Sequence, residues 1–279
     1  MWIEMAAADL AAERLAREEN GKIAADAAPK MASETEVTFE TPAGALPAIR
    51  LTPEGAAAGA AVDVFVHGGG WVFGSARQSI GIARRIAAQS GRSLLSVDYL
   101  LAPETPWPAA ADQVGALFDR LAGEGGVHAV MGSSAGAQIA LAATRRQADR
   151  GRALPKGQLL FNGAFAMTAD SWSHAAFGGG TDLLTTAAMT AYIAAYGAGA
   201  EGDMTIADLS GLPPMWLSLG DRDPLIEDSL AVFQRALAAG TKAHLDIIPG
   251  VGHGFSNDWH CNARVDHALT DAVDWLGKL

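Results

Sequence analysis

Short runs of apolar residues alternate with longer segments in which apolar residues recur every three or four positions. The short runs are rich in Val, Leu and Ile, which is typical of strands buried on both faces. They predict strands at residues 62–66, 93–99, 128–132, 158–161, 215–219 and 244–248. The longer segments predict helices at residues 79–90, 109–121, 137–150, 227–239 and 264–279. Strands separated by helices indicate an α/β fold, with a mostly parallel sheet and helices on both of its faces.

Two regions depart from this alternation. Residues 1–20 predict one amphipathic helix, and 21–29 predict a loose tail. Two β-like runs follow at 36–40 and 46–51, separated by turn-forming residues, and we expect them to form an antiparallel edge of a sheet of about eight strands. Later, residues 164–213 contain no convincing strand, and an insertion of this length is typical of a lid or a pocket wall.

Composition narrows the class of protein. The chain has 279 residues, of which 49% are apolar and 18% charged, so it can bury a large core and is not a disordered chain. The net charge of −11 argues against nucleic acid as a partner, because neutralising phosphates requires a basic face. No apolar run predicts a membrane-spanning helix, and the start of the chain lacks the pattern of a signal peptide. A single cysteine, Cys261, excludes an internal disulfide framework and a multi-cysteine metal site, so we expect a cytoplasmic enzyme.

The strongest chemical signal is the sequence Gly-Ser-Ser-Ala-Gly at residues 132–136, where a predicted strand ends and a helix begins. Glycines flank Ser134 on both sides, as a strained strand-to-helix turn requires when it lifts a nucleophilic hydroxyl above a sheet. Ser133 is the weaker candidate because the glycines bracket Ser134 symmetrically. A Gly- and Ser-rich turn without chemistry is the alternative interpretation.

A second signal is His-Gly-Gly-Gly-Trp at residues 67–71, directly after the strand predicted at 62–66. Consecutive glycines allow backbone N–H groups to turn inward and approach a ligand closely. Beside a nucleophilic serine, such a loop is expected to contribute to an oxyanion hole together with the N–H of Ala135, the residue after the nucleophile. A flexible turn is the alternative.

A nucleophilic serine requires a base, and the base requires an orienting acid. Of the seven histidines, His253 lies between glycines on the loop after the last predicted strand, where its ring can reach over the sheet. The other six are assigned to strands, to surface positions, to the insertion or to the glycine loop; they are His67, His128, His174, His244, His260 and His267. Asp221 and Asp223 follow the preceding strand and are both candidate acids.

Two other interpretations of the same residues are disfavoured. The acidic residues around Asp223 have no adjacent histidine, so a metal site is not expected there. Residues 197–202 match a dinucleotide-binding fingerprint letter by letter, but they follow a helix-like run rather than a strand. We therefore expect a flexible loop at 197–202 and no cofactor.

Five motifs in this order resemble the hormone-sensitive-lipase family of serine esterases, which has the α/β-hydrolase fold. They lie at residues 67–71, 98–114, 132–137, 223–225 and 253–255. The resemblance implies a catalytic triad in which Ser134 is the nucleophile, His253 the base and Asp223 its orienting acid. It also implies an oxyanion hole formed by the backbone N–H groups of Gly69, Gly70 and Ala135. Residues 1–35 and 164–213 would form a cap on a single domain spanning 1–279.

The chain departs from the usual family pattern at three positions. Ser133 replaces an Asp or Thr, Leu100 replaces an Arg, and Ala137 replaces a glycine. None of these removes a catalytic atom, so the resemblance implies a carboxylesterase that acts on short-acyl, neutral esters without a metal or an organic cofactor. An amide or aryl-formamide hydrolase and a non-catalytic receptor of the same fold are the alternatives, and a homo-oligomer is possible.

Overall fold

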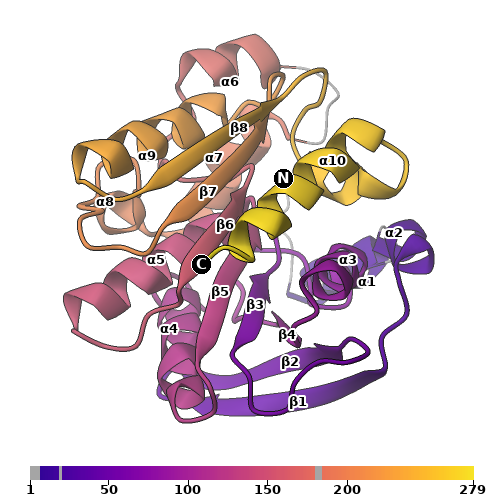
Figure 1. Ribbon diagram of the computed structural model, residues 1–279. Coiled ribbons are helices and arrows are strands. Elements are labelled where there is room, and N and C mark those ends of the chain that lie inside the picture. Colours follow the sequence, from indigo (N-terminus) through magenta and orange to yellow (C-terminus); the bar gives the residue numbers. More distant parts are fainter. Residues whose placement is uncertain (1–6, 19–20, 180–183) are drawn as a thin grey trace.

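Eight strands form one continuous sheet in the computed structural model, which describes residues 7–18, 21–179 and 184–279. The sheet order is β1-β2-β4-β3-β5-β6-β7-β8 (Figure 1). Pairing from β4 to β8 is parallel, while β1 pairs with β2 and β2 with β4 in antiparallel fashion. The strands are β1 Ser33–Thr41, β2 Gly44–Thr52, β3 Val62–Val66, β4 Leu94–Val97, β5 Val127–Ser133, β6 Gly157–Phe161, β7 Met215–Gly220 and β8 Ala243–Ile248. The prediction of a mostly parallel sheet with an antiparallel edge is confirmed.

Helices cover both faces of the sheet, as the sequence predicted. One face packs against α3 (Ile80–Ser90) and α10 (Ala263–Leu276), and the other against α4 (Ala109–Ala122), α5 (Ala135–Asp149) and α9 (Ile226–Ala238). Successive side chains of β3 point to opposite faces of the sheet, and a core lies on each face. Every position of the strand is therefore buried, which explains why its residues are almost all apolar. Val64 and Val66 belong to the core beneath α4 and α5, and Phe65 belongs to the core beneath α3 and α10.

The parallel strands bring their carboxyl ends to one edge of the sheet. The glycine loop follows β3, Ser134 follows β5, and the candidate acids follow β7. The histidine loop follows β8 and leads into a short 3-10 helix, Phe255–His260, which the sequence did not predict. Residues far apart in the sequence therefore meet at one place in the fold.

The insertion at 164–213 contains no strand within its described residues, as predicted. It consists of three helices, α6 (Trp172–Phe177), α7 (Thr186–Tyr196) and α8 (Gly199–Gly202). Two of them begin at side-chain caps, because Ser171 accepts a hydrogen bond from the His174 N–H and Thr185 accepts one from the Ala188 N–H. The prediction of a flexible loop at 197–202 is wrong, because most of that segment forms α8, whose Gly202 carbonyl accepts a hydrogen bond from Gln138.

The N-terminal prediction is partly wrong. Helix α1 is described at Ala7–Glu18, and the remaining residues of the predicted helix, 1–6 and 19–20, lie outside the described residues. The loose tail expected at 21–29 contains a second helix, α2 (Lys22–Ala27), which packs against α3. Gly21 and Gly81 permit this close packing, because a Cβ atom at Gly81 would lie 2.6 Å from the Ala24 carbonyl carbon.

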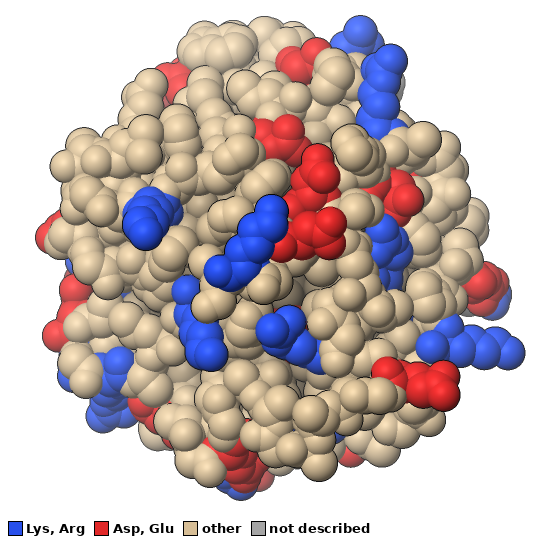
Figure 2. Space-filling model, in the orientation of Figure 1, with Lys and Arg blue, Asp and Glu red and all other residues tan. Residues whose placement is uncertain are grey.

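The described helices include none that is long and apolar enough to cross a membrane. On the face of the molecule that Figure 2 shows, the basic side chains stand apart from one another among acidic and uncharged residues, rather than joining in a stripe.

Candidate active site

Ser134 occupies the sharp turn between β5 and α5. Its backbone has φ 55° and ψ −121°, a conformation that L residues rarely adopt. Four backbone hydrogen bonds hold the turn: the Ser134 N–H donates to the Phe161 carbonyl at 2.9 Å, and the Ser134 carbonyl accepts from the N–H groups of Ala137, Gln138 and Ala164. A strained turn that its surroundings fix in this way is typical of a functional position.

The flanking glycines are required by close backbone packing. A Cβ atom at Gly132 would lie 2.3 Å from the backbone of Gly136. A Cβ atom at Gly136 would lie 2.1 Å from the Val66 carbonyl oxygen. No side chain fits at either position without moving the backbone, so strand, turn and helix approach as the sequence pattern predicted.

His253 connects Ser134 to Asp223. The Nε2 atom of His253 lies 2.9 Å from the Ser134 Oγ, and its Nδ1 atom lies 3.0 Å from each carboxylate oxygen of Asp223. Since a carboxylate accepts hydrogen bonds, Nδ1 carries the proton and donates it to Asp223, which leaves Nε2 to accept from the serine hydroxyl. This arrangement can deprotonate the hydroxyl as it attacks an electrophile.

Asp223 is held in place by its own loop. It is fully buried, and its Oδ1 atom also accepts a hydrogen bond of 2.8 Å from the Leu225 N–H. The other candidate acid, Asp221, is exposed and accepts a hydrogen bond of 2.7 Å from the Gly250 N–H. Of the two carboxylates that the sequence left open, the structure therefore brings Asp223 to the histidine, and Asp221 braces the histidine loop.

His67 and His128, which the sequence also offered, are held by other partners. His67 is buried, stacks on Tyr99 with ring centroids 4.2 Å apart, and donates from Nδ1 to the Gly68 carbonyl at 2.8 Å. Burial lowers the pKa of His67, so the ring stays neutral and braces the glycine loop. His128 is buried beside Asp63 on a neighbouring strand, with Nδ1 and Oδ1 3.2 Å apart.

The glycine loop lies directly against the nucleophile. A Cβ atom at Gly68 would lie 3.3 Å from the Ser134 Cβ. Gly69 and Gly70 have φ angles of 120° and 61°, and the Gly69 carbonyl accepts hydrogen bonds from the N–H groups of Val72 and Phe73. On the other side of the serine, Ala135 is the first residue of α5, where a helix leaves its N–H without an intrahelical acceptor. The three candidate oxyanion donors thus lie on the two segments that border Ser134.

A polar cluster lies beside the nucleophile. The Ser133 Oγ lies 3.2 Å from the Ser256 Oγ and donates to the Asn162 Oδ1 at 3.4 Å. Asn162 and Ser256 are both fully buried, and Asn162 has a positive φ of 40°. Ser133 therefore links β5 to the loop after β6 and to the segment after His253, and it takes no part in the contact between Ser134 and His253.

Asp228 is a buried carboxyl group in the first turn of α9. Its Oδ2 atom accepts hydrogen bonds of 2.9 and 2.8 Å from the consecutive N–H groups of Phe165 and Ala166. Burial raises the pKa of Asp228 to about 7, and the nearby charge of Asp223 raises it further, against the effect of the two N–H donors. Asp228 fixes the start of the insertion, just beyond the Ala164 N–H that donates to Ser134.

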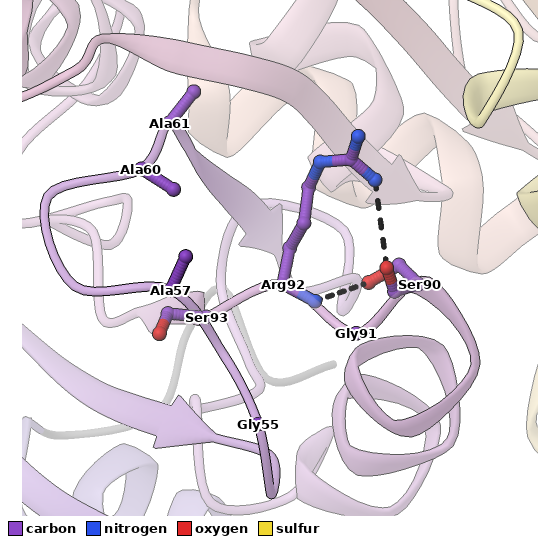
Figure 3. Close-up of a pocket in the computed structure, with 8 residues that line it drawn as sticks. All are labelled: Gly55, Ala57, Ala60, Ala61, Ser90, Gly91, Arg92 and Ser93. Carbon is purple, nitrogen blue, oxygen red and sulfur yellow. Dashed lines mark hydrogen bonds between the residues drawn. The ribbon is translucent and has the colours of Figure 1, made fainter.

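A surface hollow of about 290 Å³ lies away from these residues, between the loop 55–61 and the end of α3 (Figure 3). Gly and Ala line most of it, and Arg92 hydrogen-bonds to the carbonyl of its neighbour Ser90 at 3.5 Å. Its lining includes Ser90 and Ser93 but no histidine or carboxylate that could activate a hydroxyl, so the hollow is not the candidate active site. Within the described ranges, no three His, Cys, Asp or Glu side chains are grouped as ligands of a metal ion.

Comparisons with known proteins place this geometry in context. A family model described as alpha/beta hydrolase fold matches residues 64–257. A carboxylesterase of Mycobacterium tuberculosis is 33% identical over 215 residues, which cover 70% of this chain and 66% of the relative. An acetyl-hydrolase of Streptomyces hygroscopicus is 29% identical over 205 residues, which cover 71% of this chain and 67% of the relative. The matched region thus spans about two thirds of the length of these relatives.

Solved structures match over nearly the whole length. A hyperthermophilic esterase from the archaeon Pyrobaculum calidifontis superposes with a TM-score of 0.90 at 26% identity, covering 96% of this chain and 93% of the esterase. A thermostable carboxylesterase cloned from a metagenomic library superposes with a TM-score of 0.88 at 27% identity, and 96% of each chain is covered.

Proposed function

This chain belongs to the alpha/beta hydrolase fold family, and from that premise we propose that it is a serine carboxylesterase that hydrolyses short-acyl carboxylic esters. One observation carries the proposal. His253 bridges a strained serine and a buried carboxylate, with Nε2 2.9 Å from the Ser134 Oγ and Nδ1 3.0 Å from both Asp223 oxygens. The carboxylesterases and esterases among the similar proteins support the same reaction.

The reaction proceeds in two halves through an acyl-enzyme. In the first, the Ser134 Oγ attacks the ester carbonyl carbon while its proton passes to the His253 Nε2. The resulting tetrahedral intermediate collapses, the alcohol leaves with that proton, and the acyl group stays on Ser134. In the second half, His253 takes a proton from water, whose oxygen attacks the acyl carbon to form a second tetrahedral intermediate. Its collapse breaks the bond to Ser134, His253 returns the proton to the Ser134 Oγ, and the carboxylic acid leaves. Asp223 holds the imidazole in one tautomer and stabilises its cation in both halves.

Negative charge develops on the carbonyl oxygen in each half. The backbone N–H groups of Gly69, Gly70 and Ala135 are the donors that stabilise it. Donors already fixed by the fold are effective because they need no reorganisation during the reaction. Neither half requires a metal ion or an organic cofactor.

The acyl preference rests on the side chains around the glycine loop. The Tyr192 ring lies against Gly70, where a Cβ atom would come within 2.5 Å of the ring carbons. Three apolar side chains of the insertion belong to the same buried cluster as Trp71 and Phe73; they are Met167, Leu184 and Met189. These side chains occupy the space beside the glycine loop and leave little room for a long acyl chain, so they favour short acyl groups. Because they are mostly apolar, they also favour a neutral ester.

The proposal also assigns an organisation to the chain. We propose that the segments expected at 1–35 and 164–213 supply a cap on a single domain, except for residues 33–35, which belong to β1. The contacts of α1 with Val72 and of α6 with the Asp223 loop support this proposal. We propose that the enzyme acts in the cytoplasm, because its single cysteine gives no sign of the disulfide framework that is common in secreted proteins. Its partners are small ester substrates rather than nucleic acid, and a homo-oligomer is compatible with the proposal.

Rates on p-nitrophenyl esters of increasing acyl length, with a matched anilide of the best acyl group, test this function. We expect the highest kcat/KM at acetate or butyrate, much slower anilide hydrolysis, and a roughly 10⁶-fold loss of kcat in Ser134→Ala. A maximum at long acyl chains would overturn the short-acyl assignment, and equal rates on the anilide would indicate an amide hydrolase. Tight binding of a small ligand with no turnover of any ester would indicate a receptor.

A further inference from the structure

Gln138 is a buried polar side chain that the mechanism above does not use. It lies in α5, four residues after Ser134, and none of its surface is exposed. A buried carboxamide is unfavourable unless its donors and acceptors find partners. The partners of this carboxamide therefore indicate what it holds together.

The Gln138 side chain joins three segments of the chain. Its Oε1 atom accepts hydrogen bonds from the Trp71 indole N–H at 3.1 Å and from the Tyr196 hydroxyl at 3.3 Å. Its Nε2 atom donates to the Gly202 carbonyl at 2.8 Å. The helix that carries the nucleophile is thereby connected to the glycine loop and to two helices of the insertion.

Trp71 is the member of this group with an unusual backbone. Its φ is 62°, in the left-handed region that a bulky residue occupies only when its surroundings enforce it. The side chain is 1% exposed and stacks on Tyr196, with ring centroids 4.6 Å apart and planes 6° apart. The Trp71 carbonyl also accepts a hydrogen bond of 2.9 Å from the Ala102 N–H.

The orientation of Trp71 sets the end of the glycine loop. Gly69 and Gly70 precede it directly and are also in positive-φ conformations, so the three residues form one continuous turn. A change of backbone angles at Trp71 would redirect the peptide between Gly70 and Trp71, and the preceding peptide, which carries the Gly70 N–H, is joined to it through the two dihedral angles of Gly70. The indole N–H that Gln138 binds therefore anchors the end of the turn that carries the candidate donors of Gly69 and Gly70.

We propose that Gln138 is a positioning residue for the oxyanion hole, which holds the glycine loop in register with the helix that begins at Ala135. This inference rests on the proposed function, because it assigns a role within that active site. Helix α5 then holds both sides of the oxyanion hole. Ala135, in its first turn, supplies one N–H donor, and Gln138, one turn later, holds the loop that supplies the N–H donors of Gly69 and Gly70. Tyr196 and Gly202 extend the same network to the insertion.

A merely structural role for Gln138 makes a different prediction. Loss of packing would lower stability and leave the turnover of the folded protein unchanged. Loss of donor geometry would lower kcat with little change in KM, because the oxyanion forms only after the substrate has bound. It would also weaken a transition-state analogue in proportion to the loss of kcat.

The test compares Gln138→Met with Gln147→Met. Both glutamines are buried in α5, so the two substitutions remove a carboxamide of the same size from the same helix. Gln147 lies at the far end of that helix from the nucleophile, beside Gly115. The measurements are kcat and KM for p-nitrophenyl acetate, the inhibition constant of an aryl trifluoromethyl ketone, and the melting temperature.

We expect Gln138→Met to lower kcat about 10- to 100-fold, with KM changed less than threefold and ketone affinity reduced by the same factor as kcat. Gln147→Met should retain the kcat of the unaltered protein at a comparable melting temperature. Trp71→Phe removes the indole donor itself and should show the same changes in kcat, KM and ketone affinity as Gln138→Met. If Gln138→Met does not fold, Trp71→Phe tests the positioning role in its place.

The opposite outcomes overturn the inference. If Gln138→Met and Trp71→Phe fold and retain full kcat and ketone affinity, Gln138 does not position the oxyanion hole. A rise in KM at constant kcat would also overturn the inference and would place Gln138 in substrate binding instead. If the unaltered protein hydrolyses no ester, the proposed function itself fails, and this inference fails with it.

Discussion

At Ser134 the backbone takes angles that ordinary residues avoid, and the contacts around it explain why it remains there. The turn is compressed between β3 and α5, since Gly136 leaves no room for even one methyl group beside the Val66 carbonyl. The hydroxyl is thereby directed toward the His253 Nε2 at 2.9 Å. The position of one reactive atom thus depends on a glycine two residues away.

Gly136→Ala tests this dependence. The new Cβ atom would lie 2.1 Å from a backbone oxygen, which cannot move aside as a flexible side chain could. We expect a loss of about 1–3 kcal/mol in the free energy of unfolding, measured by urea denaturation. Gly123→Ala is the matched control, because nothing lies within 4 Å of its Cβ position and its φ is −80°. Equal stabilities of the two variants would contradict this explanation.

Asp223→Asn tests the orientation of the base. An amide in place of the carboxylate can present its NH2 group to the His253 Nδ1 and so favour the opposite tautomer, in which Nε2 carries the proton. We expect kcat to fall roughly 10⁴-fold, with the fold and KM nearly unchanged. Asp221→Asn, two residues earlier, should reduce kcat far less, because Asp221 bonds to Gly250 rather than to the histidine. A larger effect at Asp221 would show that the wrong acid has been assigned.

The sequence predicted the residues of this site unevenly. Ser134 and His253 each lie in a short glycine-flanked motif at a strand end, so local pattern alone singles them out. Asp221 and Asp223 could not be separated by residue reasoning, because only the three-dimensional loop shows which one reaches Nδ1. Gln138 was missed because its partners Trp71 and Tyr196 are each about sixty residues away, so no local pattern reveals them.

The helices differ in how far the sequence predicted them. Those that pack on the sheet alternate apolar and polar faces, and they were predicted to within a few residues. Helix α7 is composed almost entirely of Ala, Thr, Tyr, Ile and Met and has no charged face, so no helical period is visible. Helix α2 has only six residues and is held by its packing on α3, which is a long-range contact. Tertiary packing rather than local pattern determines these elements.

The Arg14 side chain attaches helix α1 to the segment that follows the glycine loop. The Arg14 guanidinium donates to the Val72 carbonyl at 2.9 Å, to the Ala102 carbonyl at 3.0 Å, and to both Glu104 oxygens at 2.8 Å. These hydrogen bonds lower the pKa of the Glu104 carboxyl group. The acceptor on Val72 follows Trp71 directly, so α1 contacts the same loop that Gln138 holds from the other side.

Arg14→Ala should therefore release α1 while the sheet stays intact. We expect faster amide hydrogen exchange in residues 7–18 and unchanged protection in β5, measured by mass spectrometry. Lys22→Ala is the control, because its ion pair with Asp26 joins two side chains that are each 69% exposed and contributes little. Unchanged exchange in residues 7–18 of Arg14→Ala would show that other contacts hold the helix.

At the scale of the whole molecule, the alternation of strands and helices predicted the layers but not the order of strands. Strands β3 and β4 are exchanged relative to their order in the sequence, so the antiparallel strand β2 pairs with β4 rather than with β3. Hydrophobic periodicity carries no information on which strand is whose neighbour. The expectation that the motifs share one site came from their chain order, not from a predicted topology.

The free energy of unfolding of the whole molecule should depend on pH through Asp228. Its pKa is 3.8 for an ordinary aspartate and about 7 in the fold, so the folded state retains a proton that the unfolded chain releases. The contribution of this group is fully present below pH 4 and is lost as the pH rises to about 7. Asp228→Asn retains an acceptor for the Phe165 and Ala166 N–H groups and cannot ionise.

Urea denaturation at pH 5 and pH 8 measures this effect. Relative to the unaltered protein, Asp228→Asn should gain stability between the two pH values, on the order of 3 kcal/mol. The exposed control Asp26→Asn should show no such gain. If the difference between the unaltered protein and Asp228→Asn does not change with pH, Asp228 is ionised throughout and its burial is compensated.

The central claim is that Ser134 forms a covalent intermediate with the help of His253. Mass spectrometry of the protein after reaction with an aryl alkylphosphonate ester, followed by peptide mapping, tests it most directly. The account predicts one adduct per chain, located on Ser134, absent in Ser134→Ala, greatly slowed in His253→Ala and retained in Ser133→Ala. Full ester turnover with no adduct, or an adduct on another residue, would contradict it.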